Sequence, residues 1–568
     1  MKHILFIIAV FVSLVSLGQR EIKKENQTKT KRTYWDFNKS QIQSRGRYFT
    51  DEQGETTDKH GEWVYYDRFG EVEEVRNYYK GGLDGAVVLF YPNGQKRQEG
   101  FFKYNRQDST YIEWYENGER KVEGEYKLDT PMGKWNYYYL DGRLKSVEEV
   151  QEGTNYLWEF FLPDSLHTQT ISDGNGELTT YYSTGKVQEW YNYENGRKHG
   201  LFEEISIYGY PTLKGEFKHG VKHGTWEYFY YTGDKEKVSH YQSGKLHGAY
   251  AYFYDNGNTN VEGIYENGDK KGKWTWYTNE GNLDMQGAFE KGLQHGDWTY
   301  WYPTGEISYK AKYLKGKKSG KWTYFYKNGG IFKEGTFEDD LKNGLWQTWY
   351  EDGTLLMKGN YTNGKETGEW FNHWENGTIK NKTTFSNGQL DGEWKSYHLN
   401  GKLALEGAYK KDLKVGEWRK YFSNGKTKEL LTYKLFQKKS KFNDAILSNR
   451  APLESRLNGS YESYALKDYK LTESGTYKNG KKNGEWTAFH PGGLVPAVVS
   501  NYKDGKLYGP MKTFSRRGVL LQEAQYKNGL RHGKYVVFDR RGRVLKELRY
   551  SDGMRVIEGK GSGSFTPR

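Results

Sequence analysis

Aromatic side chains recur at fixed places in the short stretches GDWTYWYPTG, GKWTYFYKNG and GLWQTWYEDG, which begin at Gly296, Gly320 and Gly344. Exposed tryptophan and tyrosine rings bind sugars by stacking and anchor protein interfaces. If the first glycine of each stretch is position 1, the tyrosines and tryptophans at positions 5 and 7 exceed what a sheet needs. We therefore expect partner-binding residues among Tyr228, Tyr230, Tyr252, Tyr254, Trp276, Tyr300, Tyr302, Tyr324, Tyr326, Tyr350 and Trp374.

Histidines recur directly before position 1, and imidazole is a metal ligand. Equivalent residues of neighbouring repeats should lie about 10 Å apart, since strands are spaced by about 4.8 Å. That spacing allows two ligands at most. We therefore expect turn packing and no metal site for His60, His199, His219, His223, His247, His295 and His532.

Positive charge gathers late in the chain, whose formal net charge is +13. Residues 506–549 hold 12 Lys and Arg against 3 Asp and Glu. Such a patch suits anionic lipid, polysaccharide or an acidic protein, and it can equally be a solvated edge that prevents aggregation of a long sheet. The candidate basic patch comprises Arg516, Arg517, Arg531, Lys534, Arg540, Arg541 and Arg543.

Catalytic chemistry has little support in the sequence. Asp and Glu are scattered, and no nucleophile, phosphate-loop or metal-triad motif is recognisable. The chain has no cysteine, which excludes thiol chemistry and disulfides. We therefore expect a protein that is not an enzyme and that needs no cofactor.

A 24-residue repeat determines the organisation of the chain. Position 1 recurs at this constant interval from Gly176 to Gly416, and 19 units are recognisable in all. Position 10 is glycine in 18 of them. Two longer intervals, from Gly133 to Gly176 and from Gly416 to Gly459, are equal in length, as expected for one regular unit followed by a degenerate one.

Each unit has the pattern of a β-hairpin. Positions 2–7 alternate polar and aromatic residues, positions 9–10 are often Asn-Gly or Asp-Gly, and positions 12–18 form a second strand that ends in an aromatic residue. The Asn-Gly pairs predict tight turns with positive φ at both central residues. We expect the position 3 tryptophans and position 18 aromatics to form the core of the sheet itself, by stacking between neighbouring repeats.

The pattern G-x-W-x-x-Y-x-x-x-G…Y-x-x-G-x-x-x-G resembles MORN repeats, specifically the bacterial MORN-variant type, over about Gly61 to Gly553. The resemblance implies an all-β fold: an extended single-layer antiparallel meander of about 20 tandem hairpins. It also implies scaffolding or membrane contact. Bacterial MORN-variant proteins are often labelled antitoxin components of toxin–antitoxin modules, and the resemblance implies that label here. Export, which the first residues predict, argues against a cytoplasmic antitoxin and leaves an exported immunity-like protein that neutralises a partner toxin.

The first residues, MKHILFIIAVFVSLVSLGQ, predict a secretory signal peptide cleaved between Gly18 and Gln19. The apolar run is too short for a spanning helix, no lipidated cysteine follows it, and no later segment reaches transmembrane length. We therefore expect an exported protein of the periplasm, the cell surface or the medium.

The domain boundaries follow from where the repeat holds and where it breaks. The prediction comprises a signal peptide (1–18), a polar linker (19–45), MORN-type repeats (46–154), a degenerate repeat (155–175), regular repeats (176–433), an irregular insertion (434–458), further repeats (459–553) and a flexible tail (554–568).

These features predict an exported, non-enzymatic repeat scaffold that binds a protein or envelope partner through a long aromatic face, by many weak contacts. A glycan- or cell-wall-binding repeat protein and an exported antitoxin- or immunity-like protein are the alternatives. Envelope lipid or polysaccharide binding and homo-oligomerisation stay open. Nucleic acid is not an expected partner of an exported protein.

Overall fold

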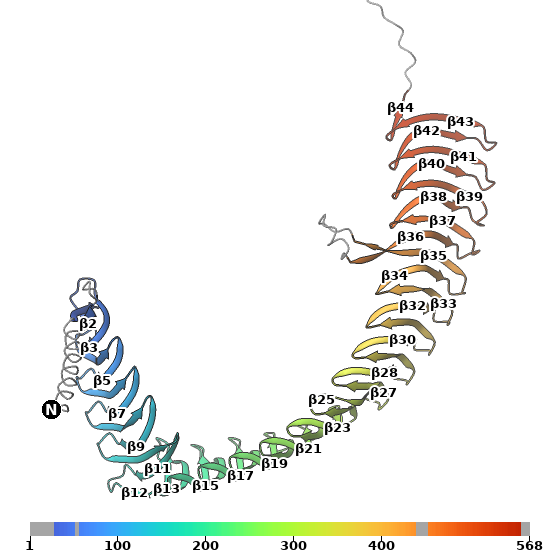
Figure 1. Ribbon diagram of the computed structural model, residues 1–568. Helices are drawn as coiled ribbons and strands as arrows, with labels where there is room; N and C mark the ends of the chain where they lie inside the picture. The colour runs from blue at the N-terminus through green and yellow to red at the C-terminus, as the bar shows by residue number, and fades with distance from the viewer. Residues whose placement is uncertain (1–27, 51–55, 439–451, 558–568) are drawn as a thin grey trace, which may run out of the picture. The chain divides into compact units, whose positions relative to one another are not determined.

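The computed structural model describes residues 28–50, 56–438 and 452–557, and these residues form β-strands joined by turns, with no helix among them (Figure 1). The chain divides into two units, residues 1–269 and 270–568. The all-β antiparallel meander predicted from the repeat is confirmed. The described residues include no helix long and apolar enough to cross a membrane. The predicted signal peptide and its cleavage site at Gly18 and Gln19 lie outside the described residues.

The strands of the first unit are β1 (Thr28–Tyr34), β2 (Ile42–Thr50), β3 (Thr56–Tyr66), β4 (Val72–Tyr79), β5 (Gly82–Phe90), β6 (Lys96–Lys103), β7 (Arg106–Trp114), β8 (Arg120–Lys127), β9 (Thr130–Tyr138), β10 (Leu144–Gln151), β11 (Thr154–Phe161), β12 (Gln169–Ser172), β13 (Asn175–Tyr181), β14 (Val187–Glu194), β15 (Arg197–Ile205), β16 (Pro211–Lys218), β17 (Val221–Phe229), β18 (Lys235–Gln242), β19 (Lys245–Phe253) and β20 (Thr259–Glu266).

From the unit boundary onward the strands are β21 (Asp269–Tyr277), β22 (Leu283–Glu290), β23 (Leu293–Trp301), β24 (Ile307–Leu314), β25 (Lys317–Lys318), β26 (Gly320–Phe325), β27 (Ile331–Glu338), β28 (Leu341–Trp349), β29 (Leu355–Thr362), β30 (Lys365–His373), β31 (Ile379–Ser386), β32 (Gln389–Tyr397), β33 (Leu403–Lys410), β34 (Leu413–Tyr421), β35 (Thr427–Gln437), β36 (Leu453–Tyr464), β37 (Leu471–Lys478), β38 (Lys481–Phe489), β39 (Pro496–Lys503), β40 (Lys506–Phe514), β41 (Leu520–Lys527), β42 (Leu530–Phe538), β43 (Val544–Ser551) and β44 (Met554–Val556).

Consecutive strands pair antiparallel within each unit, so each repeat is a hairpin that pairs edge to edge with the next. In the hairpin β23–β24, Gly296 pairs with Tyr313 and Trp298 with Ala311. β24 then pairs with β26 of the next repeat, where Tyr309 lies opposite Tyr324. The position 1 glycine, with φ of 72° at Gly296, lies inside the strand rather than in a turn. The strand is therefore locally irregular at this glycine, and a residue with a side chain would be strained at this positive φ.

The two kinds of turn differ from the prediction for the Asn-Gly pairs. At positions 9–10 only the glycine has positive φ, as at Gly329, which follows Asn328. Both central residues have positive φ in the turns that join one hairpin to the next, as at Lys291 (50°) and Gly292 (75°). The turn within a hairpin, at positions 9–10, spans more residues than the turn between hairpins, since the Tyr326 N–H bonds to the Gly330 carbonyl. The asparagine at position 9 is therefore selected by its side chain and not by its φ.

The position 3 tryptophan rings form the core, and many of them lie over a glycine of the preceding repeat. Trp346 is 3% exposed and Trp370 is 5% exposed. A Cβ placed on Gly335 would lie 2.2 Å from Cδ2 of Trp346, and one on Gly359 would lie 2.0 Å from Cδ2 of Trp370. The position 16 glycine therefore allows the indole to reach van der Waals contact with the backbone. The same contact joins Gly46 to Trp63, Gly124 to Trp135, Gly215 to Trp226, Gly287 to Trp298, Gly407 to Trp418 and Gly475 to Trp486.

The opposite side of many of these rings carries a lysine from two residues before position 1. Lys342 Nζ lies 4.7 Å from the centroid of a Trp346 ring, and Lys222 Nζ lies 3.9 Å from that of Trp226. The Trp346 indole N–H donates to the Thr336 carbonyl at 3.1 Å. The ring is thus held between glycine and ammonium, in a cation–π contact that also covers it from solvent.

The broken repeats correct the predicted boundaries in detail. The expected irregular insertion at 434–458 begins and ends as paired strand, since β35 and β36 continue together with Tyr433 opposite Leu457 and Gln437 opposite Leu453. Part of the expected linker at 19–45 is also strand, because β1 pairs with β2. β44 extends the last repeat into the expected tail. The degenerate repeat at 155–175 contains the short strand β12.

We predict that Gly359→Val lowers the free energy of unfolding by about 1–3 kcal/mol, because the added methyl groups overlap the Trp370 indole. Asn360→Val, on the exposed neighbouring residue, is the matched control and should change stability by less than about 0.5 kcal/mol. Urea unfolding followed by circular dichroism measures both. Combining Gly359→Val with Trp370→Ala should cost less than the sum of the single changes; full additivity would show that the two residues do not touch.

Candidate functional sites

The position 7 side chains, which the sequence predicts to be available to a partner, connect neighbouring repeats. Tyr302 OH donates to the Phe325 carbonyl at 2.8 Å, Tyr326 OH to Trp349 at 2.8 Å, and Tyr350 OH to His373 at 3.0 Å. The same bond runs from Tyr230 to Phe253 and from the Trp374 indole N–H to Tyr397. Each acceptor belongs to the next repeat. These side chains therefore link the turns of successive hairpins along one side of the sheet. No local pattern in the sequence predicts the bonds, because each acceptor lies in the next repeat.

Position 9 asparagines reinforce this edge. The side-chain amide of Asn376 donates to the Leu399 carbonyl at 3.1 Å, and that of Asn400 donates to the Ser423 carbonyl at 2.6 Å. On the other edge, the glycine amide of many inter-hairpin turns donates to the preceding repeat, as Gly316 does to Gln294 at 2.8 Å. Both edges of the array are thus closed by bonds between repeats.

The position 5 side chains are half-buried on the face that carries the tryptophans. In the second unit they alternate with the side chains at position 14 in one row across β21 to β26. Trp276 lies opposite Met285, which lies opposite Tyr300, and Tyr309 lies between Tyr300 and Tyr324. The Tyr300 and Tyr309 rings stack with centroids 4.0 Å apart. We call Trp276, Met285, Tyr300, Tyr309 and Tyr324 the aromatic row.

The aromatic row has a defined end. Its next members are Lys333 and Thr348, whose side chains are polar. Burial raises the pKa of Tyr300 to about 12 and lowers the pKa of Lys333. In the first unit, Tyr228 and Tyr252 occupy position 5, and Lys237 Nζ lies 3.5 Å from the Tyr228 ring centroid. Tyr254 at position 7 is half-buried. The predicted long aromatic face is therefore concentrated in a few repeats.

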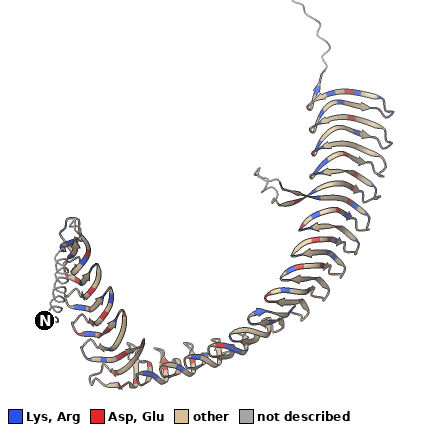
Figure 2. Ribbon diagram, viewed as in Figure 1, with Lys and Arg blue, Asp and Glu red and all other residues tan. Residues whose placement is uncertain are grey.

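The candidate basic patch separates into two groups. Arg516, Arg517, Arg540 and Arg541 are exposed in the β40–β41 and β42–β43 turns, on the same edge of successive hairpins. Arg543 pairs with Asp539 at 2.8 Å and Lys534 with Glu547 at 2.9 Å. Arg531 lies over the Tyr535 ring at 4.7 Å, in the place of the covering lysines. Figure 2 shows that residues of both signs of charge are interspersed along the hairpins. Arg543 is also an exposed turn residue, but Asp539 pairs with its charge, so the exposed basic edge consists of Arg516, Arg517, Arg540 and Arg541.

A cavity of about 790 Å³ lies where the degenerate repeat interrupts the first unit. Because β12 has four residues, the turn between β14 and β15 reaches past it, and Leu157 N–H bonds to the Gly196 carbonyl at 2.8 Å. Tyr137, Glu148, Leu157, Phe160, Tyr193 and Lys198 line the cavity. The longer interval from Gly133 to Gly176 indicates the interruption in the sequence but does not reveal that it leaves a cavity.

Burial perturbs the ionisable groups of this cavity. It raises the pKa of the Glu148 carboxyl and lowers the pKa of the Lys198 ammonium, in both cases by penalising the charged form. It also raises the pKa values of Tyr137 and Tyr193 to about 12. The cavity therefore combines aromatic surface with carboxyl, phenol and ammonium groups.

We predict that the two cavity tyrosines make stability fall at alkaline pH. Because their pKa values are raised in the folded state, their contribution is complete below pH 10, where unfolded tyrosine is still protonated, and is lost as pH rises to about 12. Tyr193→Phe should flatten the loss between pH 10 and 12 by up to about 2–3 kcal/mol. Tyr208→Phe, on a side chain that is 78% exposed, should leave the slope unchanged. The urea midpoint of unfolding, measured between pH 10 and 12, tests this. An equal fall of the midpoint with pH in the natural protein, Tyr193→Phe and Tyr208→Phe would contradict the burial of Tyr193.

We predict that Tyr326→Phe lowers the free energy of unfolding by about 0.5–1.5 kcal/mol, because the Trp349 carbonyl loses its donor. Tyr231→Phe is the control, since that tyrosine is 85% exposed in a turn of the same kind. Urea unfolding of the two variants should separate them. Indistinguishable midpoints would mean that the hydroxyl does not bind the next repeat.

Comparison with known proteins agrees with this architecture. The family model described as MORN repeat variant matches residues 83–104, 107–128, 294–315, 318–339, 342–363, 366–387, 390–411, 414–435 and 507–528. The match at 294–315 spans nearly all of β23 and the whole of β24, so one match corresponds to one hairpin. No curated protein matches the chain.

Solved structures share only low similarity with the chain. The structure entitled "Crystal Structure of TcdB2-TccC3-Cdc42" is 10% identical over 93% of this chain and 31% of its own, with a TM-score of 0.13. A Photorhabdus luminescens Tc holotoxin pore with the mutation TccC3-D651A is 11% identical over 87% and 28%, with a TM-score of 0.12. The chain thus spans about a third of the length of these structures, and at such TM-scores they indicate nothing about its fold or function. The nine matches and the hairpins that they coincide with show that the chain belongs to the MORN-repeat family.

Proposed function

We propose that the chain is an exported, non-enzymatic repeat scaffold that docks a protein partner on the aromatic row. The observation that carries the proposal is that Trp276, Met285, Tyr300, Tyr309 and Tyr324 follow one another across the sheet without a polar residue between them. All five pack against the core formed by Trp298, Ala311 and Trp322. Rings held in place in this way lose little conformational entropy when a partner covers them.

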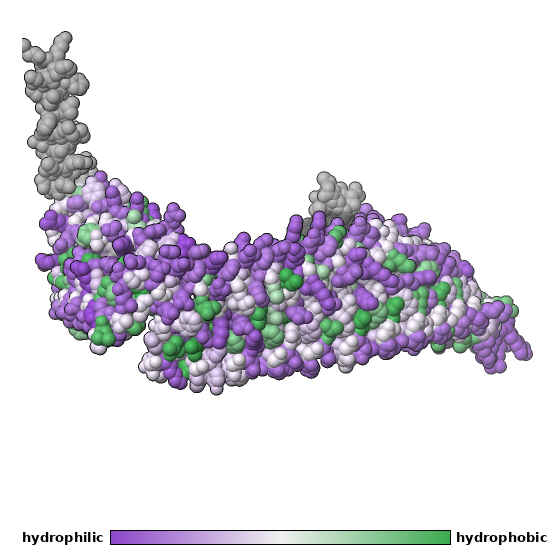
Figure 3. Space-filling model, turned by 90° about the horizontal axis from the view of Figure 1, so that it is seen from below, coloured by the Kyte–Doolittle hydropathy of each residue, from purple (hydrophilic) through white to green (hydrophobic). Residues whose placement is uncertain are grey.

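Burial of the tryptophans favours a protein partner over a glycan. Trp298 is 2% exposed and Trp322 is 3% exposed, so these rings offer no free face to a sugar. The half-buried tyrosines of the aromatic row combine apolar rings with hydroxyl groups, which suits the mixed contacts of a protein interface. The surface in Figure 3 is largely hydrophilic with scattered hydrophobic patches, as expected of a chain that binds through limited surfaces.

Export rests on the predicted signal peptide, and envelope binding is the second candidate. Four exposed arginines on one edge, at Arg516, Arg517, Arg540 and Arg541, would favour anionic lipid or polysaccharide. An antitoxin- or immunity-like role would be one form of protein binding, in which the partner is a toxin.

The chain itself supplies the substitutions for the test. Tyr309→Lys and Tyr324→Thr place on the aromatic row the residues that the next repeat carries at Lys333 and Thr348, so the fold should be kept. We expect saturable binding of a protein from the envelope fraction, and a loss of at least about tenfold in affinity in the double variant, which corresponds to about 1.4 kcal/mol. Mass spectrometry of the exported protein should first give Gln19 as its N-terminus.

The control and the competing outcomes are separable. Tyr231→Lys, in an exposed turn of the first unit, should bind as the natural protein does. Binding that survives Tyr309→Lys with Tyr324→Thr, but is lost when the four turn arginines are replaced by serine, would exclude the aromatic row and favour the basic edge. Saturable binding to purified glycans with no captured protein would favour the cell-wall alternative.

A further inference from the structure

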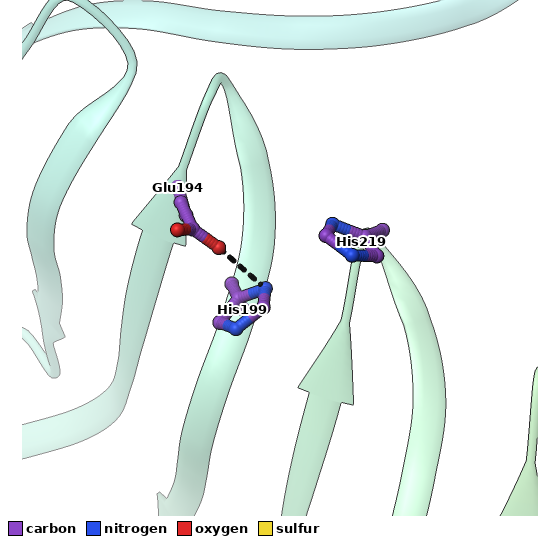
Figure 4. Close-up of side chains that lie close together, drawn as sticks. All are labelled: Glu194, His199 and His219. Atoms are coloured by element: carbon purple, nitrogen blue, oxygen red, sulfur yellow. Dashed lines mark ion pairs between the residues drawn. The ribbon is translucent and has the colours of Figure 1, made fainter.

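Two histidines and a glutamate meet where neighbouring turns of the first unit lie side by side. Glu194 ends β14, His199 lies near the start of β15, and His219 lies in the turn between β16 and β17. One ligand atom from each lies within 4.8 Å of the others, the single such group in residues 28–50, 56–438 and 452–557. His199 Nδ1 is 2.9 Å from Glu194 Oε2, and the two imidazole centroids are 5.2 Å apart (Figure 4).

The expectation of two histidine ligands at most agrees in number with His199 and His219, but it took no account of Glu194 as a third ligand. It compared equivalent positions of adjacent repeats, whereas His219 lies in the turn that leads into the next repeat. His219 has a left-handed backbone conformation, with φ of 51°, and its ring lies beside that of His199. The same two positions lie close together in other repeats. The backbone N–H of Asn267 donates to His247 Nδ1 at 3.4 Å, and that of Asp552 donates to His532 Nδ1 at 3.3 Å.

The repeats therefore contain a natural comparison. Glu290 and His295 form the same ion pair as Glu194 and His199, at 3.2 Å. The residue that takes the place of His219 beside this second pair is Lys315, which has φ of 50°. Of the histidines directly before position 1, only His199 is followed by a histidine in that turn, and the others are followed by Lys80, Ser243, Asn267, Lys315 and Asp552.

The donor set suits a divalent transition metal ion. Zn²⁺ binds imidazole nitrogen and carboxylate oxygen at about 2.0–2.2 Å, and three protein ligands leave a fourth position for water. His199 Nδ1 is shielded from solvent and makes no hydrogen bond of good geometry, although the Glu194 carboxylate lies near it. Glu194 and His219 are exposed, so their side chains are free to close the remaining distance.

The two cations that precede His199 in the sequence contact aromatic rings. The Arg197 guanidinium lies over the Tyr156 ring at 4.5 Å and bonds to its hydroxyl, and Lys198 Nζ lies 3.6 Å from the Tyr191 ring centroid. His219 also lines the 790 Å³ cavity. We propose that Glu194, His199 and His219 form a three-ligand site for Zn²⁺ or a similar divalent transition metal ion, at the rim of this cavity.

The test is Zn²⁺ titration of the full-length mature protein, free of any added histidine tag, against a chromogenic chelator. We expect one equivalent bound. His219→Lys copies Lys315 and should weaken binding by at least about 100-fold, because loss of a direct ligand should exceed the 10- to 100-fold typical of outer-shell changes. His295→Ala is the matched control, and its Zn²⁺ affinity should equal that of the natural protein.

A gain-of-site variant completes the test. Lys315→His rebuilds the same trio with Glu290 and His295 and should raise the stoichiometry from one to two. Co²⁺ in place of Zn²⁺ should give the visible absorption of four-coordinate cobalt in the natural protein and not in His219→Lys. The proposal is overturned if the natural protein binds no Zn²⁺, or if His219→Lys binds it as tightly, with circular dichroism showing that the variant is folded.

Discussion

The contact between a tryptophan ring and the bare backbone of the preceding repeat is the constraint on which the structure depends. A one-layer sheet has no second layer to cover its apolar face, so each indole must be buried by its own neighbours. Gly335 beneath the Trp346 ring and Lys342 above it bury the indole within two adjacent strands, β27 and β28. Where position 16 is the larger Ser239, the next repeat carries Tyr250 in place of tryptophan. A larger residue at position 16 does not always exclude the indole, however, since Thr383 lies opposite Trp394.

Much of the fold could be predicted from the sequence because period-2 alternation and glycine spacing are local signals. What could not be predicted depends on contacts between repeats. The position 7 tyrosines looked surplus because their acceptor, such as Phe325 for Tyr302, belongs to the next repeat. The position 16 glycine was missed, although it precedes the next tryptophan at a constant spacing in many repeats. The histidine cluster was misjudged because His219 approaches His199 from a turn and not from the equivalent position.

Function is favoured where the repeat departs from its own average. In the regular repeats most side chains pack against neighbouring repeats. The aromatic row, which ends at Lys333, and the cavity beside the short strand β12 occur in only a few repeats. A surface or a cluster present in only a few repeats is not required by the fold, since other repeats do without it. Tyr309 and His219 are therefore candidates for function, whereas the buried Trp322 belongs to the packing that the fold requires.

The central claim is that neighbouring repeats, and not single hairpins, carry the stability, as in other repeat proteins. A hairpin alone would lose the cover of its tryptophan together with edge bonds such as those from Tyr302 and Asn376. Urea unfolding of fragments 293–339, 293–387 and 293–435, which contain two, four and six hairpins, tests this most directly. The midpoint should rise with length, and the two-hairpin fragment should be largely unfolded. A two-hairpin fragment that folds with the same midpoint as the six-hairpin fragment would contradict the account.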